Sequence, residues 1–285
     1  MKLYKLKGSA FLEYLDKYYL IREDWDALIN TDQLFQTLLK KTREADEIGE
    51  PDAAKLKQAL EAPIGQQEVW AAGVTYLRSR EARMEESKKS GGADFYDKVY
   101  EAERPELFFK ALPHRVSGPG QELYIRKDSS WNVPEPELAL FINSSCHIQG
   151  YTVANDMSSR SIEGENPLYL PQAKCYEKSA GLGPCLYIPE TPIDPNAIIE
   201  MSIFRNEAKV YNDSVSISRM KRSHTELVAF LCRECSFPKG VFLMTGTCLV
   251  PPNDFTLLPG DRVEIGIGGI GSLINQIAFN PSSRL

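Results

Sequence analysis

The sequence predicts a β-rich α+β fold with a small N-terminal α/β unit. From about residue 68 onward, short apolar runs are separated by glycine and proline, which is typical of strands joined by tight turns. Helical segments are few and do not alternate with the strands, so a repeating βαβ fold is excluded. A length of 285 residues fits one large domain, or one domain with a small appendage.

The first 66 residues differ in pattern from the rest of the chain. An apolar stripe at helical spacing runs along residues 34–39, and Thr31 or Asp32 can cap this helix. A second short helix is expected over residues 53–60, and residues 62–65 form the expected linker. We therefore predict a small N-terminal domain at 1–66 and a larger domain at 67–285.

The larger domain contains one clear helix and a series of strands. Residues 223–233 predict the helix, with Ser223 as its cap. The predicted strands are 68–76, 106–112, 134–143, 147–155, 184–188, 198–205, 240–250 and 261–267.

Residues 77–104 are dense in charge and have two interpretations. Charge runs are usually solvated, which predicts a pair of surface helices. The alternative is a lid that closes over a site, with Gly91-Gly92 as its hinge. The residues alone leave both open.

Composition and charge exclude several classes of protein. The net charge is −6, so a nucleic-acid partner is not expected. No apolar run approaches the roughly 18 residues that a membrane-spanning helix needs. Six cysteines are sparse for this length, which favours a cytoplasmic location. Residues 266–271 spell G-x-G-x-x-G, but too little chain follows for a dinucleotide-binding βαβ unit.

The strongest functional signal is a group of acidic residues. Glu135 and Glu137 flank Pro136, and alternate residues of a strand share one face, so their carboxylates point the same way. Asp156 ends the next apolar strand and can complete a site of oxygen ligands. Such a site suits Mg²⁺, with Mn²⁺ and Ca²⁺ as alternatives. The competing interpretation is a solvated strand edge, with Asp156 capping a turn.

Four motifs occur in a fixed order: P-E-P-E-L-A at 134–139, G-Y-T-V-A-N-D-M-S-S-R at 150–160, L-P-Q-A-K at 170–174 and T-G-T at 245–247. Together they resemble the fumarylacetoacetate hydrolase superfamily over roughly residues 73–271. The resemblance implies a mixed β-roll fold, a homodimer or higher homo-oligomer, and metal ligands at Glu135, Glu137 and Asp156. It also implies a functional Lys174 and a substrate-binding Thr247.

Two further stretches, 104–111 and 165–172, resemble the sugar-acid dehydratases of this superfamily. That resemblance implies active-site roles for Glu106 and Lys174. Hydrolases and decarboxylases of the superfamily carry a His-x-x-Glu pair, whose positions fall here on Ser79 and Ala82. The group that would activate a hydrolytic water is absent, which favours elimination over C–C hydrolysis.

We therefore expect a lyase of sugar-acid catabolism that dehydrates a small 2-keto acid, a 2-keto-3-deoxy-pentonate, to 2,5-dioxopentanoate. Lys174 or Glu106 would remove the C3 proton, and Glu106 can instead protonate the departing hydroxyl. Arg78 can meet the negative charge of the substrate, and Tyr76 is a candidate pocket residue. Without the resemblance, Lys174 is equally a surface lysine, and Glu106 equally a partner of Lys110 along one strand.

Two rival functions remain open at this point. An acylpyruvate-type hydrolase or 2-keto acid decarboxylase would need a histidine from elsewhere in the chain. A non-catalytic sugar-acid binder would keep the metal ligands without turnover.

Overall fold

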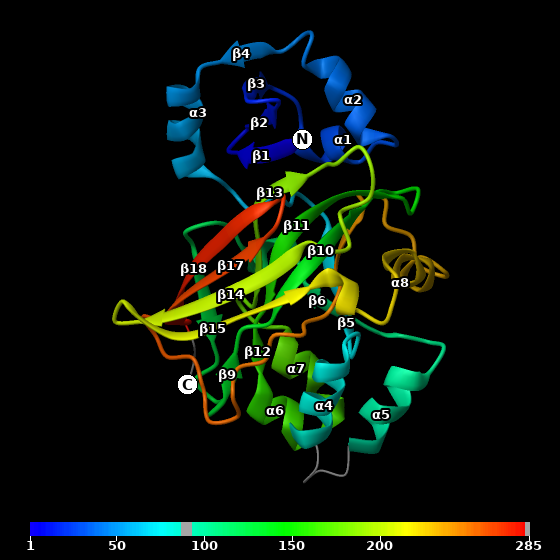
Figure 1. Ribbon diagram of the computed structural model, residues 1–285, viewed down its shortest axis with the longest axis vertical. Coiled ribbons are helices and arrows are strands. Elements are labelled where there is room, and N and C mark those ends of the chain that lie inside the picture. Colours follow the sequence, from blue (N-terminus) through cyan, green and yellow to red (C-terminus); the bar gives the residue numbers. More distant parts are fainter. Residues whose placement is uncertain (87–92, 283–285) are drawn as a thin grey trace.

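The protein is described here by a computed structural model that covers residues 1–86 and 93–282 (Figure 1). Two mixed sheets form its frame, as the prediction of a β-rich α+β fold requires. The eleven-stranded sheet runs in the order β4 (Asp46–Ile48), β3 (Lys17–Ile21), β2 (Ser9–Tyr14), β1 (Lys2–Leu6), β13 (Ala180–Tyr187), β11 (Ile148–Asp156), β10 (Pro136–Ile142), β16 (Val241–Met244), β5 (Glu68–Gly73) and β6 (Glu106–Ala111), with β7 (Val116–Ser117) paired to β13. The five-stranded sheet runs in the order β15 (Ala208–Ser216), β14 (Ile198–Arg205), β17 (Arg262–Ile267), β18 (Gly271–Phe279) and β8 (Glu122–Ile125), and β12 (Ser158–Ser159) separately pairs with β9 (Asn132–Val133).

Strand β10 is the centre of the larger sheet and is buried along its whole length. Its residues alternate between two cores, because successive side chains of a strand point to opposite faces. Leu138 and Leu140 face the five-stranded sheet, together with apolar residues of β14 and β17. Ala139 and Phe141 face the opposite core, where Phe141 packs against Phe242 with ring centroids 5.2 Å apart.

The N-terminal segment continues the larger sheet. Strand β1 pairs with β13, for example at Leu3 and Leu186. Helices α1 (Trp25–Ile29) and α2 (Leu34–Lys41) supply buried leucines to the second core, and α3 (Glu50–Leu56) with the 3₁₀ turn 57–59 follows them. The division at residue 66 stays a prediction, since the same sheet runs on both sides of it.

The predicted cap of α2 is wrong. Gln33 precedes the helix in the left-handed region, with φ of 53°, and makes no side-chain cap. The Asp32 carboxylate instead accepts a hydrogen bond from Asn143 at 2.7 Å. Asp32 therefore does not cap the helix, because its carboxylate is bound to a residue far away in the sequence. Ser223, by contrast, caps α8 (His224–Leu231) as predicted, by accepting a hydrogen bond from the Glu226 amide.

The predicted strands are present, with three ends corrected. Strand β13 begins at Ala180, four residues before the predicted start at residue 184. Strand β5 ends at Gly73, because Val74 adopts a positive φ of 53° that a strand does not allow. Strand β16 ends at Met244, because Thr245–Thr247 turn toward β10 and Gly246 has φ of 98°. The glycine-rich segment at 266–271 is the turn between β17 and β18, as expected.

Short helices gather at the end of the molecule opposite the N-terminal elements (Figure 1). They are α4 (Leu77–Glu86), α5 (Ala93–Glu101), α6 (Arg160–Glu165) and α7 (Leu170–Lys174), and single 3₁₀ turns cover 113–115, 167–169 and 217–219. Helix α4 packs on both α5 and α6. The predicted hinge at Gly91-Gly92 lies outside the described residues, and the lid role of 77–104 stays a prediction.

Across residues 1–86 and 93–282, no helix combines the length and the apolar character that crossing a membrane requires.

The buried position of β10 generates a stability prediction. Leu140→Ala should lower the free energy of unfolding by about 2–5 kcal/mol, because it leaves a cavity between the two sheets. Val210→Ala, at a 43% exposed position on the edge strand β15, is the matched control and should change it by less than about 0.5 kcal/mol. Urea unfolding measures both; equal effects would contradict the described core.

Candidate active site

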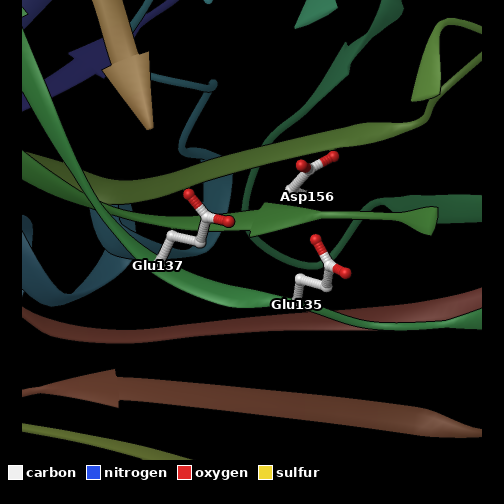
Figure 2. A group of neighbouring side chains, drawn as sticks. All are labelled: Glu135, Glu137 and Asp156. Atoms are coloured by element: carbon white, nitrogen blue, oxygen red, sulfur yellow. The ribbon is translucent and has the colours of Figure 1, made fainter. Parts of the chain in front are cut away.

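The three predicted metal ligands lie together at the end of the larger sheet (Figure 2). Glu135 precedes β10, Glu137 is its second residue, and Asp156 ends the neighbouring β11. The pairing of Pro136 with Asn155 brings these strand ends side by side. One carboxylate oxygen from each residue lies within 4.8 Å of the others, and all three residues are buried. The alternative of a solvated strand edge is therefore wrong.

Repulsion within this group is visible at Glu137. Burial, followed by the charges of Asp156 and Glu135, raises the pKa of the Glu137 carboxyl well above its usual value. The Gly246 amide donates a 2.6 Å hydrogen bond to it, but this does not offset the repulsion. The three carboxylates therefore favour a further positive charge between them.

Lys174 supplies part of that charge. It ends α7, is fully buried, and donates to Glu135 at 2.5 Å, Asp156 at 2.9 Å and the Ser158 hydroxyl at 2.6 Å. The alternative of a surface lysine is therefore wrong. An ammonium has three protons, and these three acceptors match that number.

A second buried lysine, Lys110 on β6, holds the other side of Asp156. Its ammonium lies 2.6 Å from Asp156 Oδ1 and donates to the carbonyls of Met157 and Lys174 at 2.9 and 2.6 Å. Burial lowers the pKa of Lys110, and the charge of Asp156 opposes that change. Burial alone would raise the pKa of Asp156, but the two lysines outweigh it and hold that pKa below its usual value. Within the described residues, Lys110 thus forms its ion pair with Asp156 and not with Glu106.

Glu106, at the start of β6, faces the same group. Burial raises the pKa of its carboxyl, and the charges of Arg83 and Lys174 only partly offset this. Its Oε2 atom is buried without a hydrogen-bond partner in the described part of the chain. A Cβ at Gly73 would lie 1.9 Å from that oxygen, so glycine on the paired strand β5 leaves the room that the carboxyl occupies.

A chain of ion pairs connects α4 to the ligands. Arg83 of α4 pairs with Glu163 of α6, and Arg160 lies 4.0 Å from the same Glu163. Arg160 also donates to Glu135 at 2.7 Å. All four side chains are at most 5% exposed, so a lost partner would leave a charge buried without compensation.

One small cavity is lined by the carboxylate triad, Lys174, Arg83 and Arg160, together with Gly73, Val74, Phe108 and Thr247. Glu106, Lys110 and Glu163 are not among its lining residues. Thr247 is buried, and its hydroxyl donates to the Pro136 carbonyl at 3.0 Å. Arg78 is more than half exposed and pairs with Glu81 at 3.8 Å, so it does not line this cavity. Tyr76 is buried beside it, and burial raises the pKa of its hydroxyl. A larger hollow beside α8, lined mainly by apolar groups, contains none of the predicted site residues.

The donor set fits a divalent metal. The three ligands offer oxygen only, which hard cations prefer. Burial and the neighbouring carboxylates raise the pKa of Glu137, and a bound cation would oppose both effects. Glu135, Glu137 and Asp156 would hold such an ion.

Sequence reasoning missed the groups that support this site. Arg160 ends a motif that was identified for Asp156, and Lys110 shares a strand face with Glu106 at a separation of four residues. Arg83 and Glu163 gave no signal, because each is one of many charged residues in its segment. Only the packing of α4 on α6 brings them together.

A buried carboxylate triad at a strand end, with lysines on both sides, fits a divalent metal and is the arrangement expected of an enzyme of the fumarylacetoacetate hydrolase type. The chain belongs to this family: residues 69–278 match the family model described as "Fumarylacetoacetate (FAA) hydrolase C-terminal". The predicted family and β-roll fold are thus confirmed.

Individual relatives agree. The chain is 46% identical over 237 residues to a "Probable 2-keto-3-deoxyxylonate dehydratase" of Haloferax volcanii, covering 83% of this chain and 80% of that protein. It is 36% identical to the "2-dehydro-3-deoxy-D-arabinonate dehydratase" of Saccharolobus solfataricus, covering 97% and 96%. A solved structure titled "2-keto-3-deoxy-D-arabinonate dehydratase complexed with magnesium and 2,5-dioxopentanoate" matches with a TM-score of 0.84 and 32% identity, over 98% of this chain and 99% of that one.

The repulsion at Glu137 predicts the pH dependence of the metal-free protein. Because folding raises this pKa above 4.5, the contribution of Glu137 to stability is full below that pH and is lost as pH rises through the raised pKa. Glu137→Gln removes this titration. The free energy of unfolding of Glu137→Gln, minus that of wild type, should therefore increase as pH rises from about 5 to 8. Urea unfolding in the presence of EDTA measures this difference.

Mg²⁺ should reverse that order. The free energy of unfolding of wild type should rise by about 2.7 kcal/mol at a Mg²⁺ concentration of 100 times the Kd. That of Glu137→Gln should rise much less at the same Mg²⁺ concentration. Glu122→Gln, at a half-exposed carboxylate, serves as control and should behave as wild type in both series. An equal gain for Glu137→Gln would contradict its role as a ligand.

Proposed function

We propose that the protein is a lyase that dehydrates a 2-keto-3-deoxy sugar acid, a 2-keto-3-deoxy-pentonate, to 2,5-dioxopentanoate. The observation that carries this proposal is the placement of Lys174 in the buried cavity of the carboxylate triad, with the Glu106 carboxyl near enough for the charges of Lys174, Glu135 and Asp156 to act on its pKa. The dehydratase names of the relatives and the 2,5-dioxopentanoate in the matching structure support the substrate class.

Mg²⁺ is the proposed cofactor, held by Glu135, Glu137 and Asp156, and the magnesium in the matching structure supports this choice. When bound, it supplies Lewis acidity toward the 2-keto acid end of the substrate. Thr247 lines the same cavity, and rotation of its hydroxyl from the Pro136 carbonyl would let it donate to the substrate carboxylate.

Glu106 is proposed as the general acid. A carboxyl whose pKa is raised by burial keeps its proton nearer to neutral pH and can donate it. The proton would pass to the C4 hydroxyl as the C4–O bond breaks, so the group leaves as water.

Lys174 is proposed as the base. Its amine would take the C3 proton, and the electron pair of the C3–H bond would form the C3–C4 double bond. Loss of one water and tautomerisation, with a proton moved from C5 to C3 and the enol converted to the aldehyde, then give 2,5-dioxopentanoate. In the structure the Lys174 ammonium donates to Glu135, Asp156 and Ser158, so it must first release one proton to solvent, and its neutral amine then takes the C3 proton.

Hydrolysis and decarboxylation are less well supported. The lid position at which hydrolases of the superfamily carry a histidine is Ser79 here, and its hydroxyl donates to the Tyr76 carbonyl at 2.7 Å. None of the three histidines of the chain lines the cavity. The homo-oligomer and the cytoplasmic location remain predictions from the sequence.

The test of the catalytic assignments uses 2-keto-3-deoxy-pentonate and Mg²⁺. Lys174→Met and Glu106→Gln should each lower kcat by at least about 100-fold, because each removes one proton transfer. Formation of 2,5-dioxopentanoate, followed by NMR, measures both rates. Lys178→Met, at a partly exposed lysine near the same helix, should retain wild-type turnover. Retained turnover in Lys174→Met would overturn the assignment of the base, and pyruvate release from acylpyruvates would favour the hydrolase.

A further inference from the structure

We propose that Arg83 binds the hydroxylated end of the substrate and that Glu163 is the positioning residue that holds Arg83 over the cavity. This inference rests on the proposed function, and it assigns a determinant of substrate selectivity on a helix that the mechanism does not otherwise use.

The burial of Arg83 distinguishes it from the other arginines of α4. Its side chain is 5% exposed, whereas those of Arg78 and Arg80 are 55% and 26% exposed. It lines the cavity that also contains the carboxylate triad, Lys174 and Thr247. Placing a guanidinium in a buried site is costly unless it is paired. Glu163, itself 1% exposed, pairs with Arg83 and helps to make this placement tolerable.

Within the described residues, the ion pairs of Glu163 are with arginines and not with the lysine that binds the triad. Glu163 pairs with Arg83 on one side and lies 4.0 Å from Arg160 on the other, and Arg160 in turn binds Glu135. Glu163 therefore sits between the helix that covers the cavity and an arginine fixed to a metal ligand. From this position Glu163 can orient Arg83, but it is not placed to take part in a chemical step.

The position of Arg83 indicates which end of the substrate it meets. The 2-keto acid end is assigned to the triad and Thr247, so the C4 and C5 hydroxyls extend away from them. Arg83 lies close enough to Glu106, the proposed acid at C4, for its charge to lower the pKa of that carboxyl against the effect of burial. A guanidinium offers a planar fork of N–H donors, which can contact hydroxyl oxygens while one edge pairs with a carboxylate.

The test compares two ligands that differ by one hydroxyl, 2-oxopentanoate and 5-hydroxy-2-oxopentanoate. Neither has a C4 hydroxyl, so neither can undergo the dehydration. With Mg²⁺ present, calorimetry should show that wild type prefers the hydroxylated ligand. Arg83→Met should reduce that preference by at least about 10-fold and leave the Kd of 2-oxopentanoate within about 2-fold. The KM for 2-keto-3-deoxy-pentonate should rise by a comparable factor.

Glu163→Gln tests the positioning role. Glu163→Gln should reduce the preference for the hydroxylated ligand less than Arg83→Met does. The double variant, Arg83→Met with Glu163→Gln, should lose no more of that preference than Arg83→Met alone, because the two residues act as one unit. Arg80→Met is the matched control, because Arg80 is on the same helix but pairs with Asp97 and Glu101 of α5. It should keep the wild-type preference. Arg83→Lys, which retains a positive charge, should bind 2-oxopentanoate normally and recover part of the preference.

The outcomes separate this inference from the proposed function. If wild type binds neither ligand in the presence of Mg²⁺ and does not turn over the pentonate, the proposed function fails. If wild type binds and turns over, but Arg83→Met and Arg83→Lys weaken both ligands equally or neither, Arg83 has a structural role only. In that case the inference is overturned, while the dehydratase assignment stands.

Discussion

The structure depends on the burial of eight charged side chains at one end of the larger sheet. Four are carboxylates and four are cations, so their charges cancel. The eight buried residues are Arg83, Lys110, Glu135, Glu137, Asp156, Arg160, Glu163 and Lys174. A buried charge without a partner costs several kcal/mol, so these groups constrain one another. Pairs of opposite sign run from α4 through Glu163, Arg160, Glu135, Lys174 and Asp156 to Lys110 on β6. Glu137 stands outside this chain of ion pairs, and its carboxyl accordingly has the strongly raised pKa.

This arrangement joins stability to function. Strand β6 carries Lys110 and Glu106, and helix α7 carries Lys174, so these two elements hold both the lysines that neutralise the triad and the two proposed catalytic groups. A divalent metal adds charge beside Glu137, where the network lacks it. The network also reaches α4 through Arg83, so the helix that covers the cavity is tied to a metal ligand by side chains alone. In the proposed function, substrate selectivity and metal binding would therefore depend on one set of buried contacts.

The sequence predicted the three carboxylates and Lys174, but not the other charged groups that neutralise them. Glu135, Glu137 and Asp156 could be identified because strand periodicity and motif order are local properties. Lys110 and Glu163 could not, because their partners lie 46 and 80 residues away and meet them only through the fold. Strand β15 was missed for a related reason: it is an edge strand with a mainly exposed, polar sequence, so it carries no apolar alternation. The cap of α2 failed because Asp32 is used by Asn143, a tertiary contact that local preference does not contain.

The central claim is that the carboxylate triad exists to hold a divalent cation beside Lys174. Anomalous diffraction from crystals soaked in Mn²⁺ tests it most directly, because Mn²⁺ scatters anomalously and accepts the same oxygen ligands as Mg²⁺. The account predicts one strong peak at about 2.0–2.3 Å from an oxygen of each of Glu135, Glu137 and Asp156. No peak at that position under saturating Mn²⁺, with the Lys174 ammonium still bound between Glu135 and Asp156, would contradict it.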